Sequence, residues 1–410
     1  MASSLTTQCC IVGGGPAGLV LGTLLARSGV EVIVLEKHAD FLRDFRGDTI
    51  HPPTLQAMYE LGFADELLQL PHEKIRTLHG SINGEDVILA DFSRINIRYP
   101  FIAIMPQWDL LNFLTRKASA YRNFRILMRT EATELIRDGD TIVGINATSP
   151  DGPVTIRADL TVACDGRDSH MRAQAGLQPT TLGAPMDVLW FKLSRRASDD
   201  AEPMGHFDAG RIFITINRND VWQCGYVIAK GSFGSLRQHP ITDLQETIVQ
   251  IAPIFADRVH EIGSWDDVKL LTVAVDRLPV WHKPGLLCIG DAAHAMSPIG
   301  GIGINLAIQD AIATANLLAP KLRSRSIRES DLALVQQRRE WPVRVTQWVQ
   351  VMVQNRIIAP ALADKPRGRA PWLLRHLRYI PLLRDLPARF VGIGVRPEHV
   401  TTTPQPPIKR

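Results

Sequence analysis

Residues 8–36 of the chain read QCCIVGGGPAGLVLGTLLARSGVEVIVLE, and the order of apolar runs and glycines in this stretch decides the fold. The run Gln8–Val12 predicts a short buried strand, and Pro16–Ser28 predicts a helix that stops at Gly29. Val30–Leu35 predicts a second buried strand. A strand, a helix and a strand at this spacing form a β-α-β unit, so we expect a parallel sheet in an α/β fold.

The glycines between the first strand and the helix have the spacing of a dinucleotide-binding turn. Gly13 allows the tight turn, Gly15 lets the backbone approach a pyrophosphate, and Gly18 lets the helix pack closely on the strand. The helix N-terminus offers free N–H groups and a partial positive charge to phosphates. Glu36 ends the second strand, where a carboxylate accepts hydrogen bonds from a ribose diol, and Lys37 follows it. These five residues are therefore predicted cofactor contacts.

Length and composition limit the class of protein. A chain of 410 residues with 45% hydrophobic residues has room for two or three domains and a large core. The net charge of +4 is too small to indicate a nucleic-acid partner. The five cysteines lack Cys-x-x-Cys spacing, so neither a disulfide framework nor a metal site is expected. No signal peptide or transmembrane helix is predicted, and we expect a soluble cytoplasmic protein.

The rest of the chain predicts an interleaved domain organisation. Helical patterns at Thr54–Leu70, Pro106–Ala120 and Asn305–Leu318 alternate with strand patterns at Val154–Ala163 and Leu286–Ile289. Many short β-prone runs occupy the region between residues 186 and 275, and a further β pattern lies within His79–Pro100. We therefore predict a discontinuous dinucleotide domain, a β-rich substrate domain, a C-terminal helical region and a disordered tail. The dinucleotide domain comprises residues 1–75, 100–180 and 276–330, and the substrate domain comprises residues 76–99 and 181–275. The helical region is residues 331–400, and the tail is residues 401–410.

Two further glycine signals follow the first one along the chain. Asp165-Gly166 comes directly after a predicted strand, with Ser169 and Arg172 close behind. Gly290-Asp291 also follows a predicted strand and leads into a glycine-rich loop at residues 298–303. The three signals in this order indicate FAD.

With these motifs the chain resembles the FAD-dependent aromatic hydroxylases of the para-hydroxybenzoate hydroxylase type, a class of flavoprotein monooxygenases. The resemblance covers roughly residues 8–320 and rests on Asp165-Gly166, Gly290-Asp291, Arg46 and Gln107. It implies a Rossmann-like FAD-binding domain of the GR2 type, with an inserted β-sheet substrate domain and a C-terminal helical segment.

The resemblance also implies roles for single residues. Pro298 and Gly300 would lie at the reacting face of the flavin, and Arg46 would contact the pyrophosphate or the nicotinamide. The helix that begins near Ile304 would aim its dipole at the flavin and stabilise the negative charge of the reduced ring. The further cofactor contacts implied in this way are Gln107, Asp165, Gly166, Gly290, Asp291, Gly301, Gly303 and Asn305.

The family's chemistry uses NADPH or NADH, molecular oxygen and a flavin 4a-hydroperoxide to hydroxylate or epoxidise an aromatic, phenolic or quinone-like molecule. No second G-x-G-x-x-G follows a strand, as expected where the flavin itself meets the nicotinamide. Trp190, Phe213, Trp222 and Met296 are candidates for the substrate pocket, with core packing as the alternative for both tryptophans. His294 is expected to be structural, and a role for His51 is left open.

Other functions use the same FAD frame. A flavin halogenase is disfavoured, because none of the eight tryptophans forms Trp-x-Trp-x-Ile-Pro. A reductase of an isoprenoid or similar apolar substrate and a flavin-holding scaffold or sensor remain alternatives. The basic, apolar segment Pro371–Val395 is expected to pack on its own domain or in a homodimer more readily than on an anionic membrane.

Overall fold

The computed structural model describes residues 3–42, 48–82, 85–199, 205–208, 210–218, 220–362 and 385–404. Arg46 and most of the segment 371–395 lie outside these ranges, so the roles predicted for them stay predictions.

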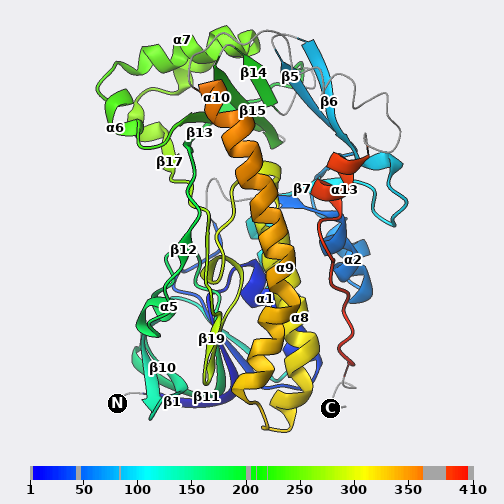
Figure 1. Ribbon diagram of the computed structural model, residues 1–410, viewed down its shortest axis with the longest axis vertical. Helices are drawn as coiled ribbons and strands as arrows, with labels where there is room; N and C mark the ends of the chain where they lie inside the picture. The colour runs from blue at the N-terminus through cyan, green and yellow to red at the C-terminus, as the bar shows by residue number, and fades with distance from the viewer. Residues whose placement is uncertain are drawn as a thin grey trace.

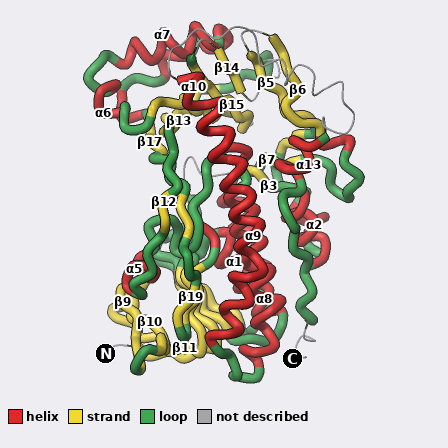
Figure 2. The backbone as a smooth tube through the Cα atoms, viewed as in Figure 1, coloured by secondary structure: helices red, strands yellow, loops and turns green. Residues whose placement is uncertain are grey.

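An eight-stranded sheet forms the lower part of the molecule (Figures 1 and 2). Four of its strand pairings are parallel, and they join β8, β2, β1, β11 and β20 in that order. The strands β1 and β2, joined by α1, form the predicted β-α-β unit, and the apolar helix α1 packs against α4 and α8. The strands are β1 (Ser3–Val12), β2 (Val32–Leu35), β8 (Phe124–Leu127), β9 (Glu131–Asp138), β10 (Thr141–Ser149), β11 (Gly152–Ala163), β19 (His282–Lys283) and β20 (Leu286–Cys288), and the helices are α1 (Pro16–Arg27), α4 (Gln107–Ala118) and α8 (Gly303–Arg323).

A seven-stranded sheet forms the upper part of the molecule. Its order is β17-β13-β16-β15-β14-β5-β6, so residues 77–91 complete a sheet that is otherwise built from residues 186–271. One face of this sheet packs on α7 (Ile241–Ile251), a helix in a region for which the sequence predicts only strands. The strands are β5 (Thr77–Ile82), β6 (Glu85–Asp91), β13 (Met186–Ser194), β14 (Gly205–Asp208), β15 (Arg211–Arg218), β16 (Val221–Ala229) and β17 (Lys269–Leu271). The predicted α/β fold with an inserted β-sheet is confirmed.

Smaller elements connect the two sheets. The helix predicted over Thr54–Leu70 is two helices, α2 and α3, because the chain turns at Gly62 with φ +75°. These elements are α2 (Pro52–Glu60), α3 (Ala64–Leu67), α5 (His170–Gln174), α6 (Phe233–Leu236), the three-stranded sheet of β3 (Thr49–Ile50), β7 (Ile102–Ile104) and β4 (Glu73–Ile75), and the pair β12 (Thr180–Thr181) and β18 (Asp276–Arg277). Short 3-10 turns occur at Phe92–Arg94, Pro253–Phe255, Val259–Glu261, Trp265–Asp267, Gly290–Ala292 and Ile299–Gly301.

The long helix α9 (Glu329–Val353) runs from beside the eight-stranded sheet to the seven-stranded sheet (Figure 1). It continues through a π-helical turn at Gln354–Ile358 into α10 (Ala359–Leu362), which packs against β15. The last described helix, α13 (Leu386–Gly392), lies against β6. Beyond it, Thr401 N–H donates to Asn316 Oδ1 at 3.0 Å and Arg27 Nη1 donates to Thr402 O at 3.0 Å. The disordered tail predicted over residues 401–410 lies mostly outside the described residues and stays a prediction.

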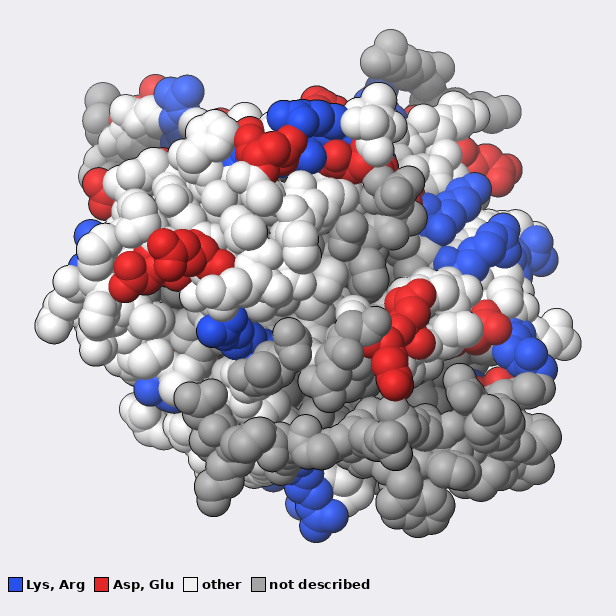
Figure 3. Space-filling view, turned by 90° about the horizontal axis from the view of Figure 1, so that it is seen from above, with Lys and Arg blue, Asp and Glu red and all other residues white. Residues whose placement is uncertain are grey.

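Two features bear on possible partners of the protein: one long apolar helix, and the distribution of charge on the upper face. The segment Ile299–Arg323 is long and apolar enough to cross a membrane. Of an apolar 18-residue window within it, however, 78% is buried inside the protein, where α8 packs against α1 and α9. Seen from above, acidic and basic side chains lie next to one another on the upper face (Figure 3). The described residues of this face therefore form no broad basic field of the kind that nucleic acids need.

Candidate active site

A cavity of about 1170 Å³ lies between the two sheets. Its lower half is formed by the carboxyl ends of β1, β2, β11 and the loop after β20, which is where parallel sheets bind ligands. Its upper half is formed by the inner face of the seven-stranded sheet and the end of α9. Sites for one small molecule are usually about 300–1,000 Å³, so this volume suits a cofactor together with a substrate.

In the first glycine turn, Gly13, Gly14 and Gly15 line the cavity, whereas Gly18 packs against the turn itself. A Cβ on Gly13 would lie 2.4 Å from Cys164 O, and one on Gly18 would lie 2.0 Å from Gly13 O. A Cβ on Gly15 would meet nothing within 4 Å. Gly15 is also the N-cap of α1 and provides no side-chain cap, so the first N–H groups of the helix are left for an anion. The turn therefore fits the pyrophosphate of a dinucleotide, although Gly18 shapes it without lining the cavity.

Carboxylates stand at the ends of the parallel strands. Glu36 accepts hydrogen bonds from Gly14 N–H at 3.1 Å and His38 N–H at 3.0 Å, and Lys37 lines the cavity beside it. Asp165 accepts from Met171 N–H at 3.1 Å through Oδ2, while its buried Oδ1 has no protein partner within the described chain. Such acceptors fit the hydroxyl groups of a ribose or a ribityl chain.

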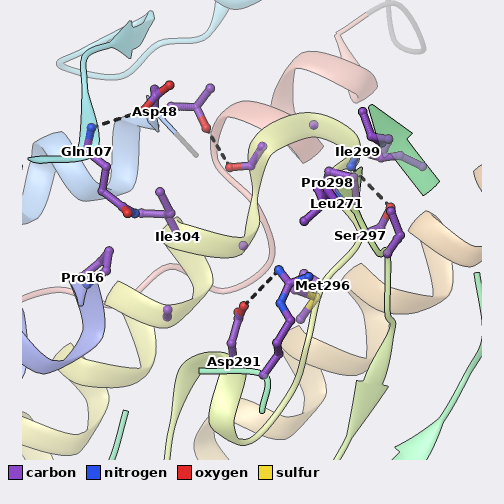
Figure 4. A pocket seen from close by; sticks show the side chains of 18 of the residues that line it. Pro16, Asp48, Gln107, Leu271, Asp291, Met296, Ser297, Pro298, Ile299 and Ile304 are labelled. Carbon is purple, nitrogen blue, oxygen red and sulfur yellow. Dashed lines mark hydrogen bonds and ion pairs between the residues drawn. The ribbon is translucent and has the colours of Figure 1, made fainter. Parts of the chain in front are cut away.

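The second and third motifs are joined by Arg172. Its Nη2 donates to Arg167 O at 2.6 Å and its Nη1 donates to Ala292 O at 3.1 Å. Asp291 lies 3.7 Å from Arg167 Nη2, and the pair faces the cavity with Gly166 (Figure 4). The two motifs thus form one wall.

The loop after Asp291 brings backbone to the cavity. Six residues of this segment line the cavity: Met296, Pro298, Gly300, Gly301, Gly303 and Ile304. Figure 4 labels Met296, Pro298 and Ile304 among them. Gly300 and Gly301 have φ values of +76° and +63°, which only glycine adopts without strain. The helix α8 starts at Gly303 without a side-chain cap, so its N–H groups are available at the cavity. On the opposite side, Gln107 lines the cavity and its N–H donates to Asp48 Oδ1 at 3.2 Å.

Two predicted cofactor contacts lie behind this wall. Asn305 uses its whole amide within the protein: Oδ1 accepts from His51 N–H at 3.0 Å and from Thr54 Oγ1 at 2.8 Å, and Nδ2 donates to Thr49 O at 3.1 Å. Gly290 turns with φ +60° and packs on Ala307. Neither residue lines the cavity, so they brace the site where we expected direct contacts.

Of the four residues predicted for the substrate pocket, the structure places two at the cavity and two away from it. Trp190 and Met296 line the cavity, but Phe213 and Trp222 do not. Both point to the opposite face, where they pack on Phe255 with ring centroids 6.0 and 6.2 Å apart. Side chains alternate along a strand, so Ile212, Ile214 and Ile216 of β15 face the cavity instead.

Several residues at the cavity were not predicted. Gln223 lines it, and Arg218 bridges the Gln223 amide oxygen and the buried Asp48 carboxylate. No sequence signal marks the ion pair of Arg218 and Asp48, because these two residues are far apart along the chain. The last residue of α9, Val353, and three residues of the π-helical turn that follows it, Arg356, Ile357 and Ile358, also line the cavity. For this part of the chain the sequence predicts only a helical region.

The two histidines near the motifs, His51 and His294, are buried within the protein. Burial lowers the pKa of His51 to about 4, and its Nδ1 donates to Val391 O at 2.6 Å. His294 is buried, with Nε2 2.6 Å from Asp310 Oδ2. Neither residue lines the cavity, which agrees with the structural role expected for His294.

Comparison with known proteins gives the same picture. Residues 6–349 match the family model described as an FAD binding domain. The chain is 32% identical to 6-methylpretetramide 4-monooxygenase of Streptomyces rimosus, over 87% of this chain and 85% of that one. It is 24% identical to para-nitrophenol 4-monooxygenase of Pseudomonas sp. strain WBC-3, over 77% and 78% of the two chains. The crystal structure of p-nitrophenol 4-monooxygenase from Pseudomonas putida shares the fold, with a TM-score of 0.78 at 19% identity over 96% of this chain and 99% of that one.

A dinucleotide turn, carboxylates at the strand ends and a large cavity with a backbone wall thus coincide with similarity to aromatic monooxygenases over most of the chain. The chain belongs to the FAD binding domain family and is an FAD-dependent aromatic monooxygenase that uses NADH or NADPH as electron donor.

Proposed function

We propose that this enzyme hydroxylates a fused-ring phenol of the aromatic polyketide type. The observation that carries the proposal is the single cavity that extends from the glycine turn, past the Pro298 loop, to a broad apolar wall. That wall includes Val188, Trp190, Ile214 and Leu271. The relative that is 32% identical is named for its action on 6-methylpretetramide, which supports a substrate of this class.

FAD would occupy the lower half of this cavity. The pyrophosphate would bind at Gly15 and the start of α1, with Gly13 and Gly18 shaping the turn and Glu36 and Lys37 beside the ribose. Gln107, Asp165, Gly166 and Asp291 would hold the ribityl chain and the remaining polar groups. The flavin ring would lie against Pro298, Gly300, Gly301, Gly303 and Ile304, and Gly290 and Asn305 would support that wall. Arg46 is kept as a proposed contact of the pyrophosphate or nicotinamide.

Bound FAD accepts a hydride from NADH or NADPH and supplies the activated oxygen for hydroxylation. The protein's own residues provide three things. The N-terminus of α8 favours negative charge at the ring edge beside it. The aliphatic wall excludes water from the reacting face. The amide nitrogen of Gln223, whose oxygen is held by Arg218, is placed to donate a hydrogen bond to a substrate oxygen.

The proposal is tested by measuring NADH and NADPH oxidation, oxygen uptake and product mass with two sets of phenols. One set is fused, and includes 6-methylpretetramide; the other has single rings, such as para-nitrophenol and resorcinol. Coupled product formation with the fused set supports the proposal. Turnover confined to single-ring phenols would refute the substrate class, and the absence of oxygen uptake with all of them would refute the monooxygenase function here.

We also propose a cytoplasmic location, which the five free cysteines support, since such thiols persist in a reducing compartment. A homodimer stays a prediction, and light scattering of the purified protein tests it.

A further inference from the structure

Three glutamines on one side of α9 and of the π-helical turn after it hold the loop around Pro298, against which the flavin ring is proposed to lie. Gln347, Gln350 and Gln354 are spaced by three and four residues, so they share one helix face. All three are at most 1% exposed. Long polar side chains are rarely buried in this way unless they satisfy other buried polar groups.

The middle glutamine holds the backbone around Pro298. Gln350 Oε1 accepts from Ser297 N–H at 3.2 Å, and its Nε2 donates to Ser297 O at 3.0 Å and to Ile299 O at 3.0 Å. The amide therefore pairs with both sides of Pro298, as a neighbouring strand would. Pro298 itself, which lines the cavity, has no N–H with which to be held.

The outer two glutamines extend this contact. Gln347 Nε2 donates to Ala295 O at 3.0 Å and to Asp276 O at 2.7 Å. Gln354 Nε2 donates to Ser297 Oγ at 2.7 Å. The loop is thus tied to α9 at residues 295, 297 and 299.

The same helix end also faces the cavity. Gln354 begins a π-helical turn, and such turns are frequent at functional sites. The residues that follow it, Arg356, Ile357 and Ile358, line the upper half of the cavity. One helical turn therefore contacts the proposed substrate chamber on one side and the Pro298 loop on the other.

We infer that Gln350 and Gln354 are positioning residues. They set the distance between the Pro298 loop and the reacting face of the bound flavin, and so determine what fraction of the activated oxygen is transferred to the substrate. The inference rests on the proposed function, because it concerns the geometry of that same site. Other supports act at the two ends of the loop, where Ala295 N–H donates to Asp276 Oδ1 at 3.3 Å and Thr49 Oγ1 donates to Gly301 O at 2.8 Å. Loss of Gln350 would leave Ser297 N–H, Ser297 O and Ile299 O without this side-chain partner.

The chain offers a matched control on the same helix. Gln336 Oε1 accepts from Trp281 N–H at 2.9 Å and its Nε2 donates to Pro279 O at 2.8 Å, so it holds a loop in the same manner. Residues 279–281 do not line the cavity. The variants Gln350→Met and Gln336→Met therefore each remove one glutamine clamp, but only the first acts at the reacting face.

Two measurements on each variant test the inference. Hydrogen exchange, measured without FAD, should lose protection at the Ser297 amide in Gln350→Met and at the Trp281 amide in Gln336→Met. With 6-methylpretetramide, the ratio of product formed to NADPH oxidised should fall about 10-fold or more in Gln350→Met only, because displacements on the order of 1 Å cost up to about 100-fold in rate. If Gln350→Met does not fold, Gln354→Met, which removes a single hydrogen bond, takes its place.

The inference would be overturned if Gln350→Met lost hydrogen-exchange protection at the Ser297 amide and still formed as much product per NADPH oxidised as Gln336→Met. A fall in coupling without any change at the Ser297 amide would also overturn it. If wild-type enzyme forms no product at all, the proposed function fails, and the visible spectrum of bound FAD decides the inference instead. A spectral shift in Gln350→Met alone supports it, whereas identical spectra in both variants refute it.

Discussion

Arg339 of α9 and Asp310 of α8 form an ion pair that is completely buried, with Arg339 Nε 2.9 Å from Asp310 Oδ1. The other carboxylate oxygen accepts from Gly290 N–H at 3.1 Å and lies 2.6 Å from His294 Nε2. Burial alone would raise the pKa of Asp310, but His294 and Arg339 hold that pKa below its usual value. The pair therefore fixes the turn that places Asp291 at the cavity.

Replacing Arg339 should destabilise the protein strongly. Arg339→Met takes the guanidinium away from the buried Asp310 carboxylate, which then keeps only His294 and Gly290 N–H as partners. Removing one partner of a buried ion pair typically costs roughly 3–5 kcal/mol of unfolding free energy. Urea unfolding of the FAD-free protein measures this. Arg344→Met is the control, since Arg344 is exposed and lies 3.7 Å from Glu340 on the same helix. A pair of that kind contributes only about 0–1 kcal/mol, and equal losses in the two variants would contradict the argument.

Substitutions in the first glycine turn should separate cofactor binding from folding. Gly15→Val should abolish FAD binding and leave the melting temperature of the FAD-free protein unchanged, because the new side chain enters open cavity. Gly18→Ala should lower that melting temperature, because its Cβ would lie 2.0 Å from Gly13 O. Flavin fluorescence and calorimetry check the two outcomes. Normal FAD occupancy in Gly15→Val would remove the pyrophosphate from this turn.

Asp291→Ala should weaken FAD binding without unfolding the protein. Loss of one hydrogen bond to a charged group costs about 1–3 kcal/mol, which corresponds to roughly 5- to 150-fold in the dissociation constant. Titration with FAD measures it. Arg167→Met removes the neighbour 3.7 Å away but keeps the carboxylate. An equal loss in both variants would show that the ion pair, and not a direct contact of Asp291 with FAD, is responsible.

The stability of the protein should fall in mild acid through His51. Burial lowers its pKa from 6.5 to about 4 in the folded state. Between these values the unfolded chain binds more protons than the folded one, so the stabilising contribution is present above pH 6.5 and is lost as the pH falls toward 4. From pH 7 to pH 5 the loss is roughly 2 kcal/mol of unfolding free energy.

His51→Asn is the variant that tests this, because its amide N–H can still donate to Val391 O and does not titrate. Its unfolding free energy should decline less than that of the wild type between pH 7 and pH 5. Parallel pH dependences of the two proteins would show that His51 is not the group involved.

The cofactor half of the site follows from sequence more completely than the substrate half, for a physical reason. Gly13 and Gly15 act through local backbone geometry, which a spacing pattern records. The sequence does not show which face of the sheet carries Phe213, because both faces are apolar: one packs on α7 and the other lines the cavity. The face of α9 that carries Gln347, Gln350 and Gln354 does have a helical spacing, but its partner loop is brought to it only by the tertiary fold.

The two tryptophans on opposite faces of that sheet give the last prediction. Trp190 lines the cavity, so Trp190→Phe should change KM and the order of preference among fused phenols while changing stability little. Trp222 is 2% exposed, and its indole N–H donates to Asp199 Oδ2 at 3.0 Å. Trp222→Phe leaves that buried carboxylate with one donor fewer, so it should lower the melting temperature and leave substrate preference unchanged. Steady-state kinetics on both variants decide the matter: a change of preference in Trp222→Phe as large as that in Trp190→Phe would mean that the cavity face has been assigned to the wrong side of the sheet.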